Sequence, residues 1–145
     1  MIPEVVATLT SGIFFGAALY INVVEQPARL SCGVPLAVTE WRPSYRRGTL
    51  MQAPLALIGS VAAFMAWSLE GSKAWLMGGL IFLAVVPFTL IVILPTNKRL
   101  ESQELDIRSK EAARLLRRWG GLHAIRSLLS GIAFVVFLAN LIVRH

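Results

Sequence analysis

Cysteine and histidine are nearly absent from this sequence of 145 residues, which contains one cysteine and two histidines. The single cysteine, Cys32, allows neither an intrachain disulfide nor a thiolate metal cage, and this excludes a secreted disulfide scaffold. The two histidines, His123 and His145, are too few for a multi-histidine metal site. We therefore expect no bound metal.

Charge is also scarce, because charged residues make up 15% of the chain and hydrophobic residues 56%, with a mean hydropathy of +0.67. Soluble domains carry about 25% charged residues. The composition therefore excludes an ordinary soluble enzyme and a disordered tail. The net charge of +6 lies between hydrophobic stretches, where basic residues meet lipid headgroups, so we expect membrane lipids and no nucleic acid as partners.

Four long stretches are almost free of charge, and each is long enough to cross a bilayer as a helix of about 20 residues. We predict membrane spans over residues 3–25, 48–69, 74–95 and 120–143 of a single integral membrane domain, residues 1–145. The first stretch lacks the basic start and the cleavage site of a signal peptide, so we expect it to stay as a helix. The predicted fold class is all-α, a bundle of four antiparallel transmembrane helices.

Basic residues distinguish the two sides of the predicted bundle. They concentrate in the connections 25–47 and 98–119, whereas the other side has only Lys73 and Arg144. The positive-inside rule places both long connections in the cytoplasm and both termini on the non-cytoplasmic side. We expect the membrane to be a bacterial inner membrane.

The connections also differ in their expected local structure. Residues 70–73 predict a tight turn that makes the second and third spans antiparallel neighbours. Ser109 is a candidate N-cap for a basic helix over residues 110–118. Gly120 and Gly121 predict a bend between this helix and the last span.

Polar residues converge on the cytoplasmic mouth of the predicted bundle, and the other half has almost none. At about 100° per residue, Trp119, His123 and Arg126 share one face of the fourth helix. Asn22 and Glu25 share one face of the first. Because lipid penalises polar groups, both faces should turn inward and form a pocket. The candidate pocket residues are Asn22, Glu25, Trp41, Tyr45, Gln52, Asn97, Trp119, His123 and Arg126.

Several of these residues also have a purely structural interpretation. Arg126 could extend to the headgroups, and His123 could be a structural histidine bonded to Glu25 or Asn97. Glu25 could mark the end of the first helix, with Arg29 facing lipid phosphate. The whole cluster favours a pocket, because a structural bundle does not need so many polar side chains at one end.

The aromatic residues leave a similar choice. Trp41, Tyr45 and Trp119 could form an aromatic belt at headgroup level, and Trp67 and Trp75 are interpreted only as belt residues at the opposite interface.

Four segments carry a family resemblance. They are residues 22–30 (NVVEQPARL), 41–47 (WRPSYRR) with 51–53 (MQA), 94–100 (LPTNKRL) and 118–126 (RWGGLHAIR). In this order they resemble the anthrone oxygenase-like family of small four-helix membrane proteins, over nearly the whole chain. The matching motif positions are Glu25, Pro27, Arg29, Trp41, Tyr45, Gln52, Asn97, Lys98, Trp119, His123 and Arg126. The family pattern has histidine where this chain has Gln26.

The resemblance implies a membrane-embedded oxygenase-like enzyme acting on a hydrophobic anthrone- or hydroquinone-type substrate with O2. Such chemistry needs a base and a stabilised oxyanion. We predict His123 as the base, since an imidazole pKa of about 6.5 suits that task. Arg126 and Asn97 would stabilise the oxyanion, and Glu25 would orient His123 or balance Arg126. The predicted substrate-binding residues are Trp41, Tyr45, Gln52, Trp119 and Asn22.

Two further interpretations remain open at this stage. The same pocket could serve a non-enzymatic membrane protein that binds a lipid, a quinone, haem or a partner protein. A small transporter is less favoured, because Pro87 interrupts the third span but no acidic residue lies at mid-membrane. We expect no cofactor beyond O2 as co-substrate, although His123 could still ligate haem. The pairs Gly12/Gly16 and Gly78/Gly79 could pack helices within one chain or between copies of a homo-oligomer.

Overall fold

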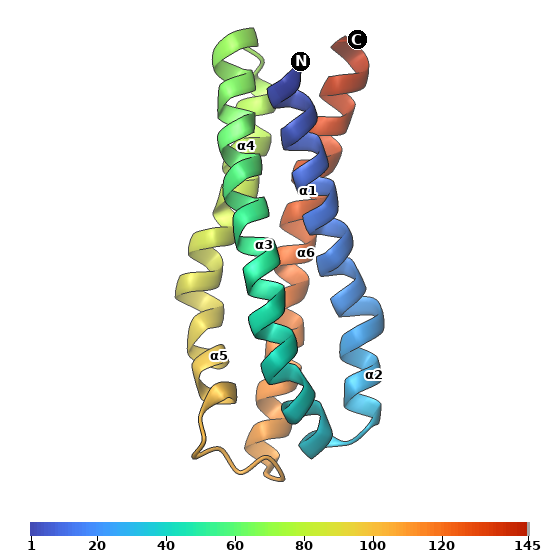
Figure 1. Cartoon of the computed structure of the whole chain (residues 1–145), viewed down its shortest axis with the longest axis vertical. Helices are drawn as coiled ribbons and strands as arrows, with labels where there is room; N and C mark the ends of the chain where they lie inside the picture. The colour runs from blue at the N-terminus through green and yellow to red at the C-terminus, as the bar shows by residue number, and fades with distance from the viewer. Residues whose placement is uncertain (145) are drawn as a thin grey trace.

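The computed structural model describes residues 1–144 and is helical almost throughout (Figure 1). Its elements are α1 (Ile2–Tyr20), η1 (Ile21–Glu25), α2 (Gln26–Ser31), α3 (Val34–Glu70), α4 (Lys73–Phe88), η2 (Thr89–Ile93), α5 (Leu94–Glu101) and α6 (Lys110–Arg144). The two η elements are π-helical turns, so that α1–η1–α2 and α4–η2–α5 each form one continuous rod. The four rods are long and apolar enough to cross a membrane, which confirms the all-α, four-helix class.

The four rods form a closed ring. Helix α1 packs against α3 and α6, and α4 packs against the same two helices. Both ends of the chain lie at the same end of the bundle (Figure 1). The predicted tight turn joins α3 to α4, and its Gly71 has a φ of +70°, a left-handed conformation that glycine adopts without strain.

Two apolar cores fill the ring. The first lies in the half that holds the chain ends and combines alanines with Phe14, Phe82 and Phe137. Gly78 makes room there, because a Cβ atom at this position would lie 2.4 Å from the Phe137 ring. Gly78 therefore packs within the chain. The second core surrounds Trp41 at the opposite end.

The helices extend beyond the predicted spans into segments expected to be connections. Contacts between these extensions stabilise them. Arg42 donates hydrogen bonds of 2.9 Å to the carbonyls of Leu100 and Ser102. Arg99 donates to both carboxylate oxygens of Glu111 at 2.7 and 3.1 Å, and these bonds lower the pKa of the Glu111 carboxyl.

The last connection confirms one local prediction and corrects another. The Ser109 hydroxyl accepts a 3.1 Å hydrogen bond from the Ala112 backbone N–H, as an N-cap does. The bend predicted at Gly120 and Gly121 is wrong, because α6 is a single helix through both. At Gly120, the missing side chain lets the Gln26 side chain pack closely against the helix.

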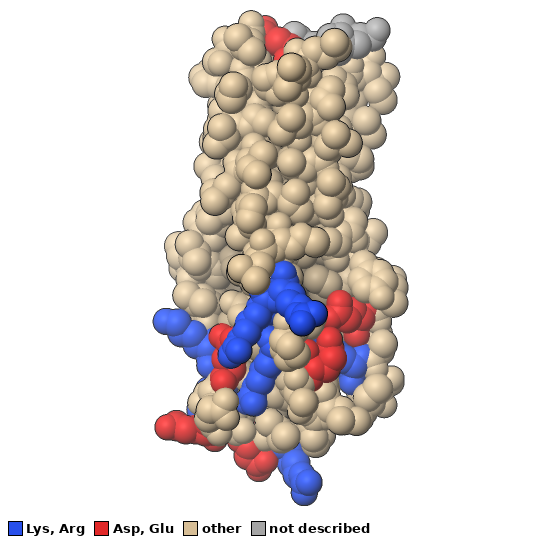
Figure 2. All heavy atoms as spheres, in the orientation of Figure 1, with Lys and Arg blue, Asp and Glu red and all other residues tan. Residues whose placement is uncertain are grey.

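Charged side chains gather at one end of the molecule, around α2, α5 and the turn before α6 (Figure 2). The rest of the surface shown is almost free of charge. Large apolar side chains are exposed along the helices, as at Leu9, Val61 and Ile91. This distribution matches a body surrounded by lipid with one polar end.

The opposite end holds more polar groups than the sequence analysis expected. Trp75 is 1% exposed and donates a 3.0 Å hydrogen bond to Glu70, so its interpretation as a belt residue is wrong. Ser72 bonds Asn140 at 3.1 Å, and the buried Glu4 lies 2.6 Å from the amino group of Met1. These contacts hold the ends of the helices together.

Candidate functional site

The first part of the site is a hydrogen-bonded contact between η1 and α6. The Asn22 side-chain nitrogen donates to the Gly120 carbonyl at 3.0 Å. Its oxygen therefore accepts, at 2.8 Å from Nδ1 of His123 and at 2.7 Å from the Ser127 hydroxyl. An acceptor facing Nδ1 places the imidazole proton on Nδ1 and leaves the lone pair on Nε2.

His123 is enclosed by its neighbours and borders a small chamber. The ring is 2% exposed and stacks on Trp119 with centroids 4.8 Å apart. His123, Trp119, Gln52 and Arg126 line a small chamber of about 20 Å³, together with Ile21, Ser44, Tyr45, Gly48 and Thr49. Space of this size holds about one water molecule.

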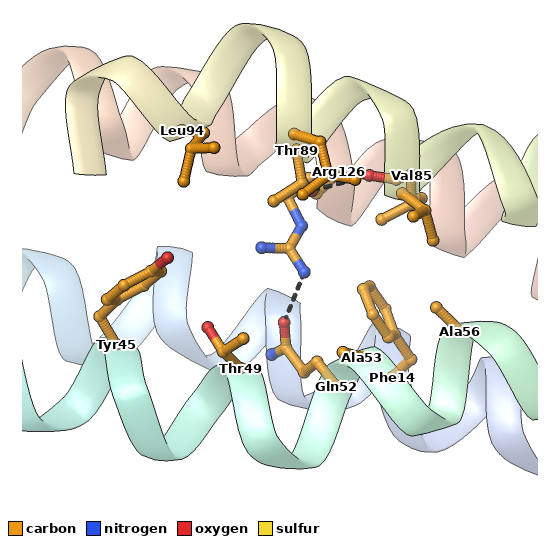
Figure 3. Close-up of a pocket in the computed structure, with 12 residues that line it drawn as sticks. Phe14, Tyr45, Thr49, Gln52, Ala53, Ala56, Val85, Thr89, Leu94 and Arg126 are labelled. Carbon is orange, nitrogen blue, oxygen red and sulfur yellow. Dashed lines mark hydrogen bonds between the residues drawn. The ribbon is translucent and has the colours of Figure 1, made fainter. Parts of the chain in front are cut away.

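The second part of the site is the guanidinium of Arg126. One of its NH2 groups donates a 2.9 Å hydrogen bond to Oε1 of Gln52 (Figure 3). The guanidinium carbon lies 5.4 Å from the centre of the Phe14 ring. The buried Nε of Arg126 has no hydrogen-bond partner among the residues that the structure describes. Within residues 1–144 no carboxylate forms an ion pair with Arg126. No carboxylate in the described part of the chain therefore neutralises this positive charge.

Arg126 and Gln52 also form the polar wall of a larger chamber of about 140 Å³. Tyr45 and Thr49 of α3 lie on one side of it, facing Thr89 and Leu94 across the gap (Figure 3). Phe14, Ala53, Ala56, Val85, Val86 and Leu90 complete the lining. Tyr45, Thr49, Gln52 and Arg126 line both chambers, so the two share a wall.

A separate polar cluster lies closer to the charged end, around Arg29. Its side chain is 3% exposed and contacts Glu25 and Glu40, with further hydrogen bonds to Gln26 at 3.1 Å and Ser44 at 3.2 Å. Partial burial raises the pKa of the Glu40 carboxyl, and the charge of Arg29 opposes this effect. Arg29 therefore does not face lipid phosphate.

The structure brings together six of the predicted site residues and separates three. Asn22, Tyr45, Gln52, Trp119, His123 and Arg126 lie around the two chambers. Glu25 bonds Arg29 and Ser44 instead of His123, and helix α1–η1–α2 continues past it. Asn97 is buried without a hydrogen bond in the described structure. Trp41 is fully buried behind Tyr45 and lines neither chamber.

Three of these residues differ in detail from the predictions. Asn22 was expected to bind substrate and instead holds His123. The belt interpretation of Trp41 and Trp119 is wrong, because the side chains are 0% and 5% exposed and the rings pack edge to face inside the bundle.

Several residues of the site are not indicated by the sequence alone. Ser127 lies one helical turn after His123 and Thr49 one turn after Tyr45, so helical spacing could have found both. No pattern indicated Phe14, Thr89 or Leu94, because their place depends on how the rods pack. Among the described residues, no group of three His, Cys, Asp or Glu side chains is arranged to hold a metal ion.

Comparison with known proteins places these observations in a family. The anthrone oxygenase family matches residues 41–136. An anthrone oxygenase of Claviceps purpurea is 26% identical over 140 residues, covering 86% of this chain and 80% of that protein. Anthrone oxygenase tpcL of Aspergillus fumigatus is 27% identical over 138 residues, covering 88% and 86%.

A noranthrone monooxygenase of Aspergillus flavus is also similar, at 25% identity over 146 residues, covering 86% of this chain and 66% of that protein. These relatives are fungal and give no support to the bacterial membrane expected from the sequence. No solved structure matches the chain.

Proposed function

This chain belongs to the anthrone oxygenase family, and on that premise we propose that it oxidises a hydrophobic anthrone- or hydroquinone-type substrate with O2 inside the membrane. The names of its relatives support an oxygenase-like function. The four apolar helices support a location in the bilayer, where such substrates and O2 dissolve.

One observation carries the proposal in this chain. Asn22 holds Nδ1 of His123, and His123 lines a chamber that shares a wall with the cavity of Arg126, so we assign Nε2 as the base of this chamber. A neutral base and an unneutralised cation beside one cavity are the two groups that proton removal from an acidic C–H bond requires.

The reaction balances with O2 as the oxidant. Loss of a proton from the benzylic carbon of an anthrone gives a delocalised carbanion–phenolate. This anion transfers one electron to O2, and the two radicals combine to form a carbon-bound hydroperoxide. Loss of water from the hydroperoxide gives the quinone, so that one O2 is consumed and one water and one quinone are formed.

The residues that line the two chambers have different roles in this reaction. Nε2 of His123 accepts the proton, with one water in the small chamber as the bridge to the substrate carbon. Arg126 stabilises the phenolate oxygen in a site with little water. Tyr45 offers a flat face to the aromatic rings. Glu25 and Asn97 take no part in this proposal, because they line neither chamber.

The proposal also includes the orientation of the protein in the membrane and its co-substrate. The charged end with α2 and α5 faces the cytoplasm, on the positive-inside rule. O2 is the co-substrate, and no further cofactor enters the steps above.

The proposal is tested with the purified protein in nanodiscs and 1,8-dihydroxyanthrone as the substrate. We expect O2 uptake and quinone absorbance to rise together at one O2 per quinone, well above the spontaneous oxidation in protein-free nanodiscs. A rate equal to that of protein-free nanodiscs contradicts an oxygenase. Binding of the compound without O2 uptake would favour the non-enzymatic alternative.

A further inference from the structure

The larger chamber is open toward the lipid that would surround the bundle. Thr49 and Ala53 of α3 and Leu90 of η2 line it and are also exposed on the surface. The surface around them is apolar, with Leu50 77% and Ile91 73% exposed. The chamber therefore opens sideways between α3 and η2, at a level where the protein surface contacts lipid.

The deep wall of this chamber is positive. Arg126 has Gln52 as its hydrogen-bond partner, carries a buried Nε without a partner, and pairs with no carboxylate among the described residues. A partly buried charge inside a lipid-facing bundle is costly unless an opposite charge joins it. The chamber thus combines an apolar entrance with a site for one negative charge.

We propose that the ligand enters this chamber laterally from the bilayer, between α3 and η2, as a flat aromatic molecule whose ionised oxygen binds Arg126. The inference rests on the proposed function for the identity of the aromatic class. It goes further in assigning a route, a rim of Thr49, Ala53 and Leu90, and a charge state for the bound ligand.

The size of the chamber indicates that the ligand is only partly enclosed and extends sideways into the opening. At about 140 Å³ it is smaller than the roughly 300–1,000 Å³ of ordinary ligand pockets. A three-ring ligand therefore places its polar edge against Arg126, while the rest of its rings occupies the opening between α3 and η2.

Local structure explains why the opening lies here. Pro87 lacks a backbone N–H, and the π-helical turn Thr89–Ile93 follows it within the same rod. A π-helical turn inserts an extra residue and changes the path of the rod. The chamber lies beside this turn, because Thr89 and Leu90 of η2 line it together with Leu94, the residue that follows the turn.

The test narrows the entrance without changing Arg126 or His123. The Ala53→Trp variant is compared with wild type and with Ala124→Trp, whose alanine is also exposed on the surface but lines neither chamber. Each protein is placed in nanodiscs without O2, and binding of 1,8-dihydroxyanthrone is measured as the amount of compound retained above that in protein-free nanodiscs. The absorbance spectrum of the retained compound then reports whether it is neutral or anionic.

We expect Ala53→Trp to weaken binding by about tenfold or more and Ala124→Trp to leave it nearly unchanged. If Ala53→Trp does not fold, as judged by circular dichroism, Leu90→Trp provides the same test from the opposite rim. Equal binding by the rim variant and wild type overturns lateral entry, and so does an equal loss in Ala124→Trp.

The absence of O2 separates this inference from the proposed function. One outcome is that wild type binds the compound but shows no O2 uptake, while Ala53→Trp loses the binding. This outcome supports the lateral entrance and refutes the oxygenase. Oxidation by wild type that Ala53→Trp leaves unchanged keeps the oxygenase and refutes the entrance. A bound probe that keeps the spectrum of its neutral form overturns the ionised state assigned here.

Discussion

Replacing His123 with alanine is expected to lower the turnover of 1,8-dihydroxyanthrone by about 10²- to 10⁴-fold, the range that general bases contribute. The side chain removed is the proposed base, which lines the small chamber. Anaerobic binding of the same compound should persist, because Arg126 and Tyr45 remain in place. The measurement is O2 uptake by the protein in nanodiscs, together with anaerobic binding.

The other histidine supplies the control for this variant. His145 lies outside the described residues, and a His145→Ala variant should keep the wild-type rate. Turnover by His123→Ala within a factor of two of wild type would remove His123 from the mechanism.

Replacing Arg126 with glutamine is expected to lower kcat/KM by about 10²- to 10³-fold, as the loss of an oxyanion stabiliser does. Its thermal stability should not fall, because the variant removes a partly buried cation that forms no ion pair with a carboxylate among the described residues. The two readouts, kinetics and the melting temperature in detergent, should therefore move independently. That separation distinguishes a ligand-binding charge from a structural one.

Arg46→Gln is the matched control. Arg46 is exposed and pairs with Glu101 at 3.0 Å on the surface, where an ion pair contributes little. We expect wild-type kinetics and nearly wild-type stability from this variant. A large drop in the melting temperature of Arg126→Gln, with kinetics unchanged, would mean that Arg126 is a structural residue.

The sequence was sufficient for the fold class and for part of the site. Stretches without charge predict membrane helices, since no other structure satisfies the backbone in lipid. The spacing of Trp119, His123 and Arg126 predicts a shared face because α6 is a regular helix, and the structure places all three beside the small chamber. Tyr45 and Gln52 on α3 join them there.

Irregular local structure explains what the sequence did not predict. The π-helical turn Ile21–Glu25 changes the direction of the side chains that follow, so spacing along an ideal helix misplaces Glu25. Arg29 meets Glu40 and Ser44, which are 11 and 15 residues away, through the fold rather than through a motif. Asn97 is predicted as a site residue because it is polar and lies near a helix end. Only the packing shows that it lies away from the chambers.

The central claim is that Asn22 fixes the His123 ring with its proton on Nδ1 and its lone pair on Nε2. Nitrogen-15 NMR of the His145→Gln variant, labelled in histidine and held in nanodiscs at pH 8, reports on His123 alone. The account predicts a neutral ring protonated at Nδ1, with the signal changing in an Asn22→Leu variant. A ring protonated at Nε2, or one that Asn22→Leu leaves unaltered, would contradict it.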